Sequence, residues 1–406
     1  MQPEQLLKAW FGYDAFRPGQ REIVTAILSG RDCLALLPTG GGKSVCFQVP
    51  ALMQNGVTFV ISPLISLMED QVAHLQRNGI PAVCLNSSMS KHTYNRTLYE
   101  VGAGAFKLLY LSPERLQNEA FLRFARQNPP DFVVVDEAHC VSQWGHDFRP
   151  SYLQIRDFVE ALPKRPLYAA FTATATPAVR QDIIRGLGMK EPEVICRGFD
   201  RPNLFFAKRA VADKDRALLD FLEKQQQRNG IVYCATHPYT EHVFRLLLQR
   251  RYRVARYHAG LTTGERQAVQ NAFLAGRLQI VVATSAFGMG IDKEDISFVV
   301  HYNLPQSLEE YYQEAGRAGR NGEEAYCLLF YSRDDLTVAE ALARRQTEPE
   351  RAQGLLRALW KYCQYDGCLR NYILRYFGED RNEPCGKCGA CCSGSLWQRI
   401  YKYFTI

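Results

Sequence analysis

The sequence predicts an α/β protein in which two tandem parallel-sheet domains are followed by a small helical module. Short, continuous apolar runs alternate with helical stretches, a pattern typical of parallel strands that helices cover on both faces. The runs fall into two sets around a turn-rich segment near residue 200, and a dense group of cysteines lies near the end. We therefore expect domains over residues 1–200, 201–340 and 341–392, with a short tail over 393–406.

The apolar runs define the expected strands in chain order. The first domain should contain strands at 32–38, 58–63, 107–113, 131–137 and 166–175. After the turn segment RGFDRPN (197–203), the second should contain strands at 230–236, 253–260, 278–284, 298–305 and 324–331. Beyond about residue 340 the sequence becomes helical, basic and finally rich in cysteine, as a separate small module would be.

The composition favours an intracellular protein with a polyanionic partner. The net charge is +7, and the segment from Arg344 to the end holds 11 basic and 6 acidic residues, or +5 of that total. This asymmetry favours nucleic acid, although a basic solvated surface has the same composition. We find no apolar run of membrane-spanning length and no signal pattern, so we expect no membrane segment and a cytoplasmic, nucleoid or nuclear location.

The stretch DCLALLPTGGGKSVCFQVP (32–50) places a strand, a glycine turn and the start of a helix in succession. In such a loop, backbone N–H groups and the helix N-terminus bind phosphate, the lysine reaches the β- and γ-phosphates, and the next hydroxyl binds Mg²⁺. The strict pattern needs a glycine where this chain has Leu37, so a plain glycine turn is the alternative. The residues expected to bind the nucleotide here are Thr39, Gly40, Gly41, Gly42, Lys43 and Ser44.

A second element supports the phosphate site. VVVDEAH (133–139) is a strand that ends in two acids, Asp136 and Glu137. One acid at a strand end can hold Mg²⁺ and the next can orient the attacking water, because Mg²⁺ needs few carboxylates besides phosphate oxygens. The alternative, a solvated acidic turn, is weakened by Lys43 and Ser44 upstream.

With TGGGKS, DEAH and AFTATAT in this order, the chain resembles superfamily 2 helicases, whose P-loop does not require the glycine at position 37. IVVATSAFGMGIDK (280–293) and YYQEAGRAGRNG (311–322) look like the fifth and sixth motifs of that superfamily. SQWGHDFRPSY (142–152) is similar to the aromatic-rich loop of RecQ helicases, and WFGYDAFRPGQ (10–20) to their adenine-recognition motif. The resemblance covers nearly all of residues 6–392 and implies two RecA-like domains.

The resemblance implies how ATP is bound and cleaved. Tyr13 and Arg17 would sandwich the adenine, and Gln20 would hydrogen-bond its edge. Asp136 would hold Mg²⁺ through water, and Glu137 would orient the attacking water. From the second domain, Arg317 and Arg320 would reach the γ-phosphate as arginine fingers, which contribute ~10³–10⁵ in rate.

The aromatic-rich loop is expected to bind DNA. Trp144, Phe148 and Arg149 offer stacking and cation–π surfaces for unstacked bases. A buried core role is the alternative for Trp144, but its neighbours are too polar for a buried stretch. Because the loop follows the acid pair closely, DNA contact there could shift the acids and link strand binding to hydrolysis. The other residues expected to contact DNA or couple it to hydrolysis are His139, His146, Thr172 and Thr174.

One departure from the family lies in YCATHPYTEHV (233–243). The family usually has a Ser–Arg pair where this chain has Thr236 and His237, so a phosphate contact there is expected to be weaker or pH-dependent.

The cysteine group reads C-x16-C-x2-C-x2-C from Cys368. Zn²⁺ takes four tetrahedral ligands, and CxxC spacing lets one turn supply two thiolates. RecQ proteins place a zinc site here, and Cys363 is the alternative to Cys368. The expected zinc ligands are Cys368, Cys385, Cys388 and Cys391.

The sequence as a whole predicts a monomeric, ATP-dependent DNA helicase of RecQ type that moves 3′ to 5′ in recombination or repair, with Mg²⁺ and Zn²⁺ as cofactors. Single-stranded and tailed or forked DNA are the expected partners, and a single-strand-binding or topoisomerase partner is left open. Many RecQ proteins continue into a winged helix, whereas SGSLWQRIYKYFTI (393–406) is expected to dock on the body or fray. A translocase with little unwinding and a nucleotide-gated DNA-binding switch are the alternatives.

Overall fold

The computed structural model describes residues 2–38, 40–86, 89–142, 147–225, 227–288 and 293–392. The chain forms two compact units, Met1–Gly198 and Phe199–Ile406. Within the described ranges, no helix is long and apolar enough to cross a membrane.

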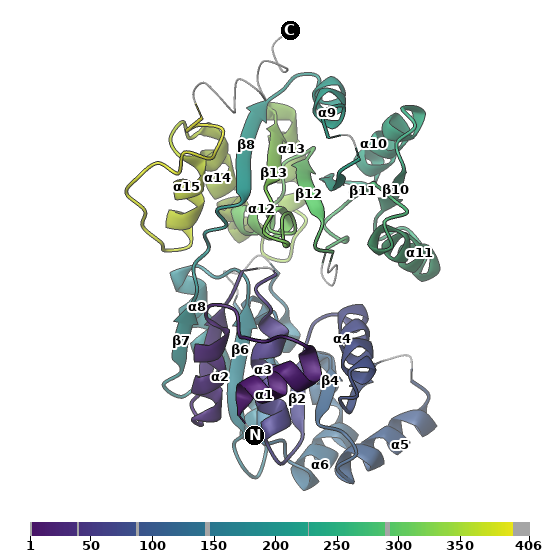
Figure 1. The fold of residues 1–406 in the computed structure, drawn as a ribbon, viewed down its shortest axis with the longest axis vertical. Coiled ribbons are helices and arrows are strands. Elements are labelled where there is room, and N and C mark those ends of the chain that lie inside the picture. Colours follow the sequence, from purple (N-terminus) through teal and green to yellow (C-terminus); the bar gives the residue numbers. More distant parts are fainter. Residues whose placement is uncertain are drawn as a thin grey trace. The chain divides into compact units, whose positions relative to one another are not determined.

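The first unit is built on a seven-stranded parallel sheet with the order β3-β4-β2-β5-β6-β1-β7 (Figure 1). Its strands are β1 (Cys33–Leu36), β2 (Thr58–Ile61), β3 (Ala82–Leu85), β4 (Leu108–Leu111), β5 (Phe132–Val135), β6 (Leu167–Thr172) and β7 (Glu193–Cys196). Its helices are α1 (Pro3–Leu6), η1 (Leu7–Phe11), α2 (Gln20–Leu28), α3 (Lys43–Met53), α4 (Ile65–Arg77), α5 (Lys91–Gly102), η2 (Pro113–Gln117), α6 (Glu119–Gln127), η3 (Ala138–Val141), α7 (Pro150–Glu160) and α8 (Pro177–Leu187).

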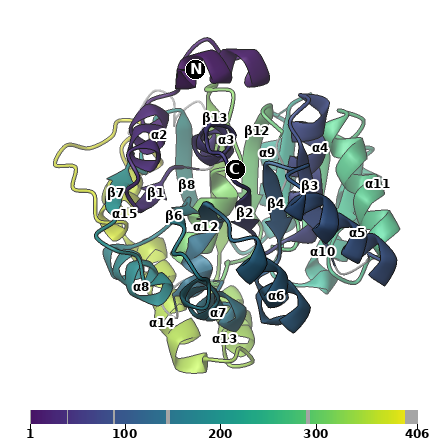
Figure 2. The same cartoon turned by 90° about the horizontal axis from the view of Figure 1, so that it is seen from below.

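Helices cover both faces of this sheet. Figure 2 shows α2, α3 and α4 on one side, and α6, α7 and α8 on the other. Strands β1, β2, β4 and β5 are buried at every residue, as expected for a sheet without a solvent face. On one face, Phe47 of α3 packs edge-on against Phe171 of β6, with ring centroids 5.3 Å apart. This packing fixes the start of α3 against the middle of the sheet.

The second unit contains a six-stranded parallel sheet with the order β10-β11-β9-β12-β13-β8 (Figure 1). Its strands are β8 (Leu204–Ala210), β9 (Asn229–Tyr233), β10 (Val254–Tyr257), β11 (Ile280–Ala283), β12 (Ile296–His301) and β13 (Ala325–Tyr331). Its helices are α9 (Lys214–Leu222), α10 (His237–Gln249), α11 (Thr263–Leu274), α12 (Leu308–Ala315), α13 (Arg333–Ala343), α14 (Pro349–Gln364) and α15 (Leu369–Tyr376).

The cysteine-rich segment packs against the edge strand β8 of this sheet. Phe206 of β8 forms an isolated bridge with Cys388, and the Gly389 N–H donates to the Phe206 carbonyl at 2.8 Å. Arg370 of α15 donates to Asp200 Oδ1 at 2.7 Å and to the Arg201 carbonyl at 2.6 Å. The segment therefore belongs to the second compact unit and stabilises the first residues of that unit, around Asp200 and Arg201.

The predicted fold class is confirmed, and each of the ten expected strands is present. The sequence analysis missed three strands, β3, β7 and β8. Strands β3 and β7 are edges of the first sheet and are only partly buried, so their sequences lack the continuous apolar run used to find the others. Strand β8 begins directly after the turn segment, and its last three residues include the partly exposed basic side chains of Lys208 and Arg209.

Candidate functional site

A glycine turn joins the end of β1 to the first residue of α3, Lys43. Gly40 and Gly42 have φ values of 82° and 72°, in the left-handed region that favours glycine. A Cβ on Gly42 would also lie 2.4 Å from the side-chain nitrogen of Gln20. Glycine is therefore favoured at both positions. The turn leads directly into the N-terminus of α3, where phosphate is expected to bind. Thr39 lies outside the described residues.

Gln20 braces this turn from α2. Its buried side-chain amide donates to the carbonyls of Gly41 and Gly42 at 3.0 and 3.1 Å, and its oxygen accepts from the Arg17 N–H at 2.9 Å. The Arg17 guanidinium donates to the Gly40 carbonyl at 2.9 Å. Tyr13 and Arg17 are both exposed, so a base can reach them. This bracing could not be predicted from a local motif, because it joins segments about 20 residues apart.

Gln20→Ala is expected to raise the KM for ATP about tenfold, because two hydrogen bonds of about 0.5–1.5 kcal/mol each no longer hold the turn. Steady-state ATPase measurements check this. The matched control on α2 is Arg21→Ala, whose exposed side chain pairs with Glu4 and should leave KM unchanged. An unchanged KM for Gln20→Ala would contradict the bracing role.

The acid pair follows β5 directly. The Glu137 backbone has φ 47° and ψ 47°, and its N–H donates to Asp136 Oδ1 at 3.0 Å. A left-handed conformation is uncommon for a residue other than glycine, and such strain is concentrated at functional sites. The Glu137 carboxylate lies 3.3 Å from Lys43 Nζ, so the structure brings the expected phosphate-binding lysine and the expected water-orienting acid together.

The chemistry of Asp136 suits a cation ligand. Burial and then the Glu137 carboxylate raise the pKa of Asp136, to about 6, although Lys43 opposes the shift. A bound cation would favour the ionised carboxylate. Together with the Ser44 hydroxyl in the first turn of α3, Asp136 provides oxygen ligands of the kind that Mg²⁺ prefers.

A chain of contacts runs from Glu137 to the end of β6. His139 Nδ1 lies 3.4 Å from Glu137 Oε2 and 2.9 Å from Thr172 Oγ1. The Thr172 hydroxyl donates to the Thr174 carbonyl at 3.2 Å and accepts from the Thr174 N–H at 3.3 Å. Of the residues expected to contact DNA or couple it to hydrolysis, His139, Thr172 and Thr174 are thus in contact with the acid pair or with each other.

The aromatic-rich loop is described only in part, because Trp144 and His146 lie outside the described residues. The guanidinium of Arg149 donates to the Pro63 carbonyl at 3.1 Å and to Asp147 Oδ2 at 3.1 and 3.3 Å. These contacts hold it against the body of the unit, so its contact with bases, like that of Phe148, stays a prediction.

Tyr152 ties the far end of this loop to the acid pair. It is fully buried, and its hydroxyl donates to the Asp136 carbonyl at 3.0 Å. The sequence analysis gave Tyr152 no role, although it is the last residue of the motif SQWGHDFRPSY. A displacement of the loop that moved Tyr152 would therefore act directly on the backbone of Asp136.

The two arginines expected to act as fingers have different surroundings in the second unit. Arg317 is 5% exposed, and its guanidinium donates to the Gly288 carbonyl, which fastens the sixth motif to the fifth. Arg320 is only partly buried. Glu314 in the same motif accepts or donates a hydrogen bond with His301 Nε2 at 2.8 Å, and burial raises the pKa of Glu314 to about 8, with Arg317 opposing the shift.

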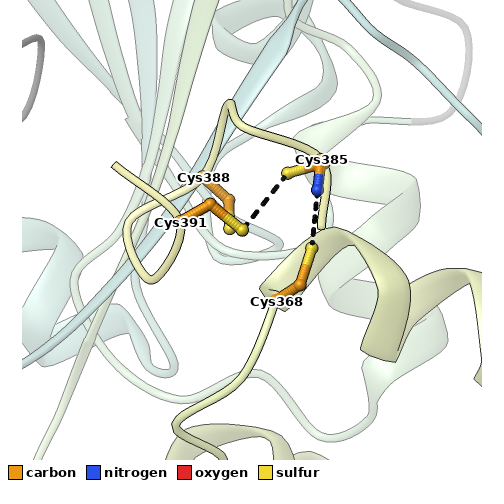
Figure 3. Close-up of side chains that lie close together, drawn as sticks. All are labelled: Cys368, Cys385, Cys388 and Cys391. Atoms are coloured by element: carbon orange, nitrogen blue, oxygen red, sulfur yellow. Dashed lines mark hydrogen bonds between the residues drawn. The ribbon is translucent and has the colours of Figure 1, made fainter. Parts of the chain in front are cut away.

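Four cysteines gather at the start of α15 and in the loop after it (Figure 3). The sulfur atoms of Cys368, Cys385, Cys388 and Cys391 lie within 4.8 Å of one another, and those of Cys385 and Cys391 are 4.0 Å apart. Tetrahedral zinc with Zn–S bonds of about 2.3 Å requires sulfurs about 3.8 Å apart, so the four residues fit this ion. Backbone N–H groups of Cys385 and Lys387 donate to the sulfurs of Cys368 and Cys385, respectively, at 3.4 Å.

Cys363, the alternative ligand, is buried elsewhere and does not belong to this cluster. Within the cluster, a hydrogen bond from Cys385 lowers the pKa of Cys388 to about 4. The same hydrogen bond raises the pKa of the Cys385 thiol.

Three family models match successive parts of the chain. Residues 17–183 match the DEAD/DEAH box helicase model, 213–322 the helicase conserved C-terminal domain, and 333–392 the RecQ zinc-binding model. The chain is 44% identical over 392 residues to the ATP-dependent DNA helicase RecQ of Bacillus subtilis, covering 96% of this chain and 66% of that protein. It is 38% identical to the putative ATP-dependent RNA helicase R290 of Acanthamoeba polyphaga mimivirus, covering 96% of this chain and 72% of that protein.

The chain belongs to the RecQ helicase family. A further relative, the ATP-dependent DNA helicase RecQ of Pasteurella multocida, is 43% identical over 95% of this chain and 61% of that protein. The RecQ-family chain thus spans about two thirds of the length of these two bacterial relatives. The resemblance stated from the motifs is confirmed, and so is the presence of a RecQ zinc-binding domain.

Solved structures share the fold of this RecQ-family chain at low sequence identity. The DUF1998 helicase MrfA bound to DNA has a TM-score of 0.68 and 17% identity over 94% of this chain and 59% of that chain. Dbp5 of S. cerevisiae bound to RNA and ADP BeF3 has a TM-score of 0.67 and 18% identity over 88% of this chain and 98% of that chain. These likenesses show two RecA-like domains.

Proposed function

We propose that this chain is an ATP-dependent DNA helicase, in which ATP hydrolysis drives 3′-to-5′ movement along single-stranded DNA and opens duplexes during recombination or repair. The observation that supports this best is the chain of contacts from Lys43 through Glu137 and His139 to Thr172. A simple ATPase needs only the first two residues. The further contacts, through His139 to Thr172 at the end of β6, connect Glu137 to a part of the domain outside the nucleotide site. A motor needs such a connection to couple hydrolysis to movement.

In the proposed reaction, the first unit holds and orients ATP. The adenine lies between Tyr13 and Arg17 near Gln20, and the glycine turn, Lys43 and the N-terminus of α3 bind the phosphates. Ser44 and Asp136 would hold Mg²⁺, which would supply positive charge to neutralise the phosphates. Glu137 orients the attacking water and accepts its proton.

The second unit completes the charge neutralisation in this proposal. Arg320 is partly accessible and reaches the γ-phosphate, whereas Arg317, buried against the Gly288 carbonyl, positions the sixth motif. An arginine supplied by a separate domain couples the chemistry to domain closure, because the site is complete only when the domains meet.

DNA binding is assigned to the aromatic-rich loop, with Trp144, His146, Phe148 and Arg149 contacting bases or phosphates. Trp144→Ala is expected to abolish most of the stimulation of ATPase by DNA while basal ATPase remains, because base stacking contributes about 1–3 kcal/mol per base. ATPase rates with and without oligodeoxythymidylate check this. An equal loss of both rates would contradict the coupling role of the loop.

A paired assay tests the proposed function. Unwinding of a 3′-tailed DNA duplex and DNA-stimulated ATPase are measured on the same preparation, and both are expected. ATPase activity without unwinding would support a translocase that remodels DNA without opening it. The absence of both activities would support a nucleotide-gated switch. Because one relative is named an RNA helicase, a 3′-tailed RNA duplex is included, and preference for RNA would overturn the DNA assignment.

A further inference from the structure

The first residues of the second unit contact the end of the sixth motif. From the sequence, RGFDRPN (197–203) is only a turn between the two expected domains, but Arg201 within it has a partly buried side chain. Its guanidinium donates to three backbone carbonyls, those of Gly316 at 3.2 Å, Ala318 at 3.0 Å and Gly319 at 2.8 Å. One side chain thus binds the turn that directly precedes Arg320.

The turn needs hydrogen-bond donors from outside the helix. Helix α12 ends at Ala315, and residues 316–319 are buried, where a carbonyl without a donor is costly. A positive charge is also favourable at this end of the helix, because the helix dipole is negative there. The planar guanidinium of Arg201 supplies several N–H donors in a fixed fork, which a lysine ammonium cannot reproduce. Arg201 is therefore suited to hold this turn in one conformation.

Arg201 is held in turn by the helical module that carries the cysteine cluster. Arg370 of α15 is 2% exposed, and it donates to the Arg201 carbonyl at 2.6 Å and to Asp200 Oδ1 at 2.7 Å. Arg381 donates to the other carboxylate oxygen of Asp200 at 2.8 Å. Two arginines of the module therefore fix the backbone of Arg201 and the side chain of the residue before it.

The preceding residue, Phe199, is fixed by the same module. Its N–H donates to Glu379 Oε1 at 2.7 Å, and its ring stacks on that of Phe377 with centroids 4.6 Å apart. The Tyr312 hydroxyl of α12 donates to the Phe199 carbonyl. Residues 199–201 therefore contact both the cysteine-bearing module and the sixth motif, and they connect the two.

We propose that Arg201 is a positioning residue for ATP hydrolysis, because it holds the turn before Arg320 in the place from which that guanidinium reaches the γ-phosphate. Through Asp200 and Arg370, the cysteine-bearing module keeps Arg201 in place. This inference deepens the proposed function and rests on its assignment of Arg320. An arginine finger acts on charge that develops in the transition state, so a displaced turn lowers kcat and leaves ATP binding largely intact.

The test is a double-mutant cycle between Arg201 and Arg320, measured as DNA-stimulated ATPase of the full chain. Arg201→Ala is expected to lower kcat about tenfold to a hundredfold with KM for ATP within about twofold of the wild type, because a misplacement of about 1 Å has effects of this size. In a protein that already carries Arg320→Ala, the same change should lower kcat by less than about twofold, because the finger that it positions is gone. Arg201→Lys should restore only part of the turnover.

Two further variants accompany the cycle. Arg253→Ala is the matched control, because Arg253 is an exposed arginine of the same unit that donates to the Gly276 carbonyl at 3.3 Å, and it should leave kcat unchanged. Asp200→Asn tests the link to the cysteine-bearing module and should lower kcat about threefold, because it weakens two charge-assisted hydrogen bonds. Its zinc content per chain should equal that of the wild type. Turnover is expressed per bound fluorescent ATP analogue, so that unfolded protein does not count.

Three results would overturn the positioning role. They are an unchanged kcat in Arg201→Ala, a rise in KM with kcat preserved, and a loss of equal size with and without the Arg320 side chain. An unchanged kcat in Asp200→Asn would overturn the part assigned to the cysteine-bearing module. Wild-type ATPase is measured with and without oligodeoxythymidylate, so that a lack of stimulation identifies a failure of the proposed function instead.

Discussion

Replacing Glu137 with glutamine is expected to lower the turnover of ATP by at least about a hundredfold while ATP still binds, since a positioned general base contributes about 10²–10⁴ to a rate. The amide keeps the size of the side chain but cannot accept the proton of the attacking water. The Lys43 ammonium, 3.3 Å from the carboxylate, remains available to the phosphates. DNA-stimulated ATPase and the affinity for a fluorescent ATP analogue measure the two effects separately.

Glu160→Gln is the matched control for this experiment. Glu160 lies at the end of α7, is largely exposed, and pairs with Arg156 on the surface at 2.8 Å. Its substitution should leave turnover within experimental error of the wild type. A turnover for Glu137→Gln within about threefold of the wild type would show that another group orients the water.

Cys388→Ser is expected to remove the single zinc and destabilise the second unit by several kcal/mol, because structural zinc sites contribute about 10–16 kcal/mol of metal-binding free energy to folding. Cys388 belongs to the cluster expected to hold zinc and also bridges to Phe206 of β8. The zinc content per chain and the thermal unfolding of the full chain are measured, and a chelator should reproduce the effect by releasing about one zinc.

Two other cysteines serve as controls for the zinc prediction. Cys392→Ser changes the residue next to the cluster, and Cys363→Ser changes the alternative ligand, which is buried elsewhere. Both should retain about one zinc per chain. Zinc-free wild-type protein, or loss of zinc from Cys363→Ser alone, would contradict the ligand set.

The features of this molecule that could be predicted from the sequence are those that depend on residues close together along the chain. Buried parallel strands such as β5 read as unbroken apolar runs, and the residues of the glycine turn lie side by side in TGGGKS. The clustering of the four cysteines could be predicted because three of them lie at metal-ligand spacing. In each case a short-range pattern fixes the local geometry.

What could not be predicted depends on contacts between distant residues. The bracing of the glycine turn by Gln20 and the hydrogen bond from Tyr152 to Asp136 join segments that have no common motif. The left-handed conformation of Glu137 and the burial of Arg317 against the Gly288 carbonyl arise only after the chain has folded. The hydrogen bonds from Arg201 to the sixth motif join residues 115 to 118 positions apart.

The position of the cysteine loop on β8 has a consequence for solubility. Strand β8 is the last strand of its sheet, and an uncovered edge strand exposes unpaired backbone groups that can recruit a strand from another molecule. The loop occupies part of that edge, with the Gly389 N–H on the Phe206 carbonyl. The cysteine loop therefore covers part of the edge at which a strand of another molecule could pair, and its loss is expected to promote self-association at β8.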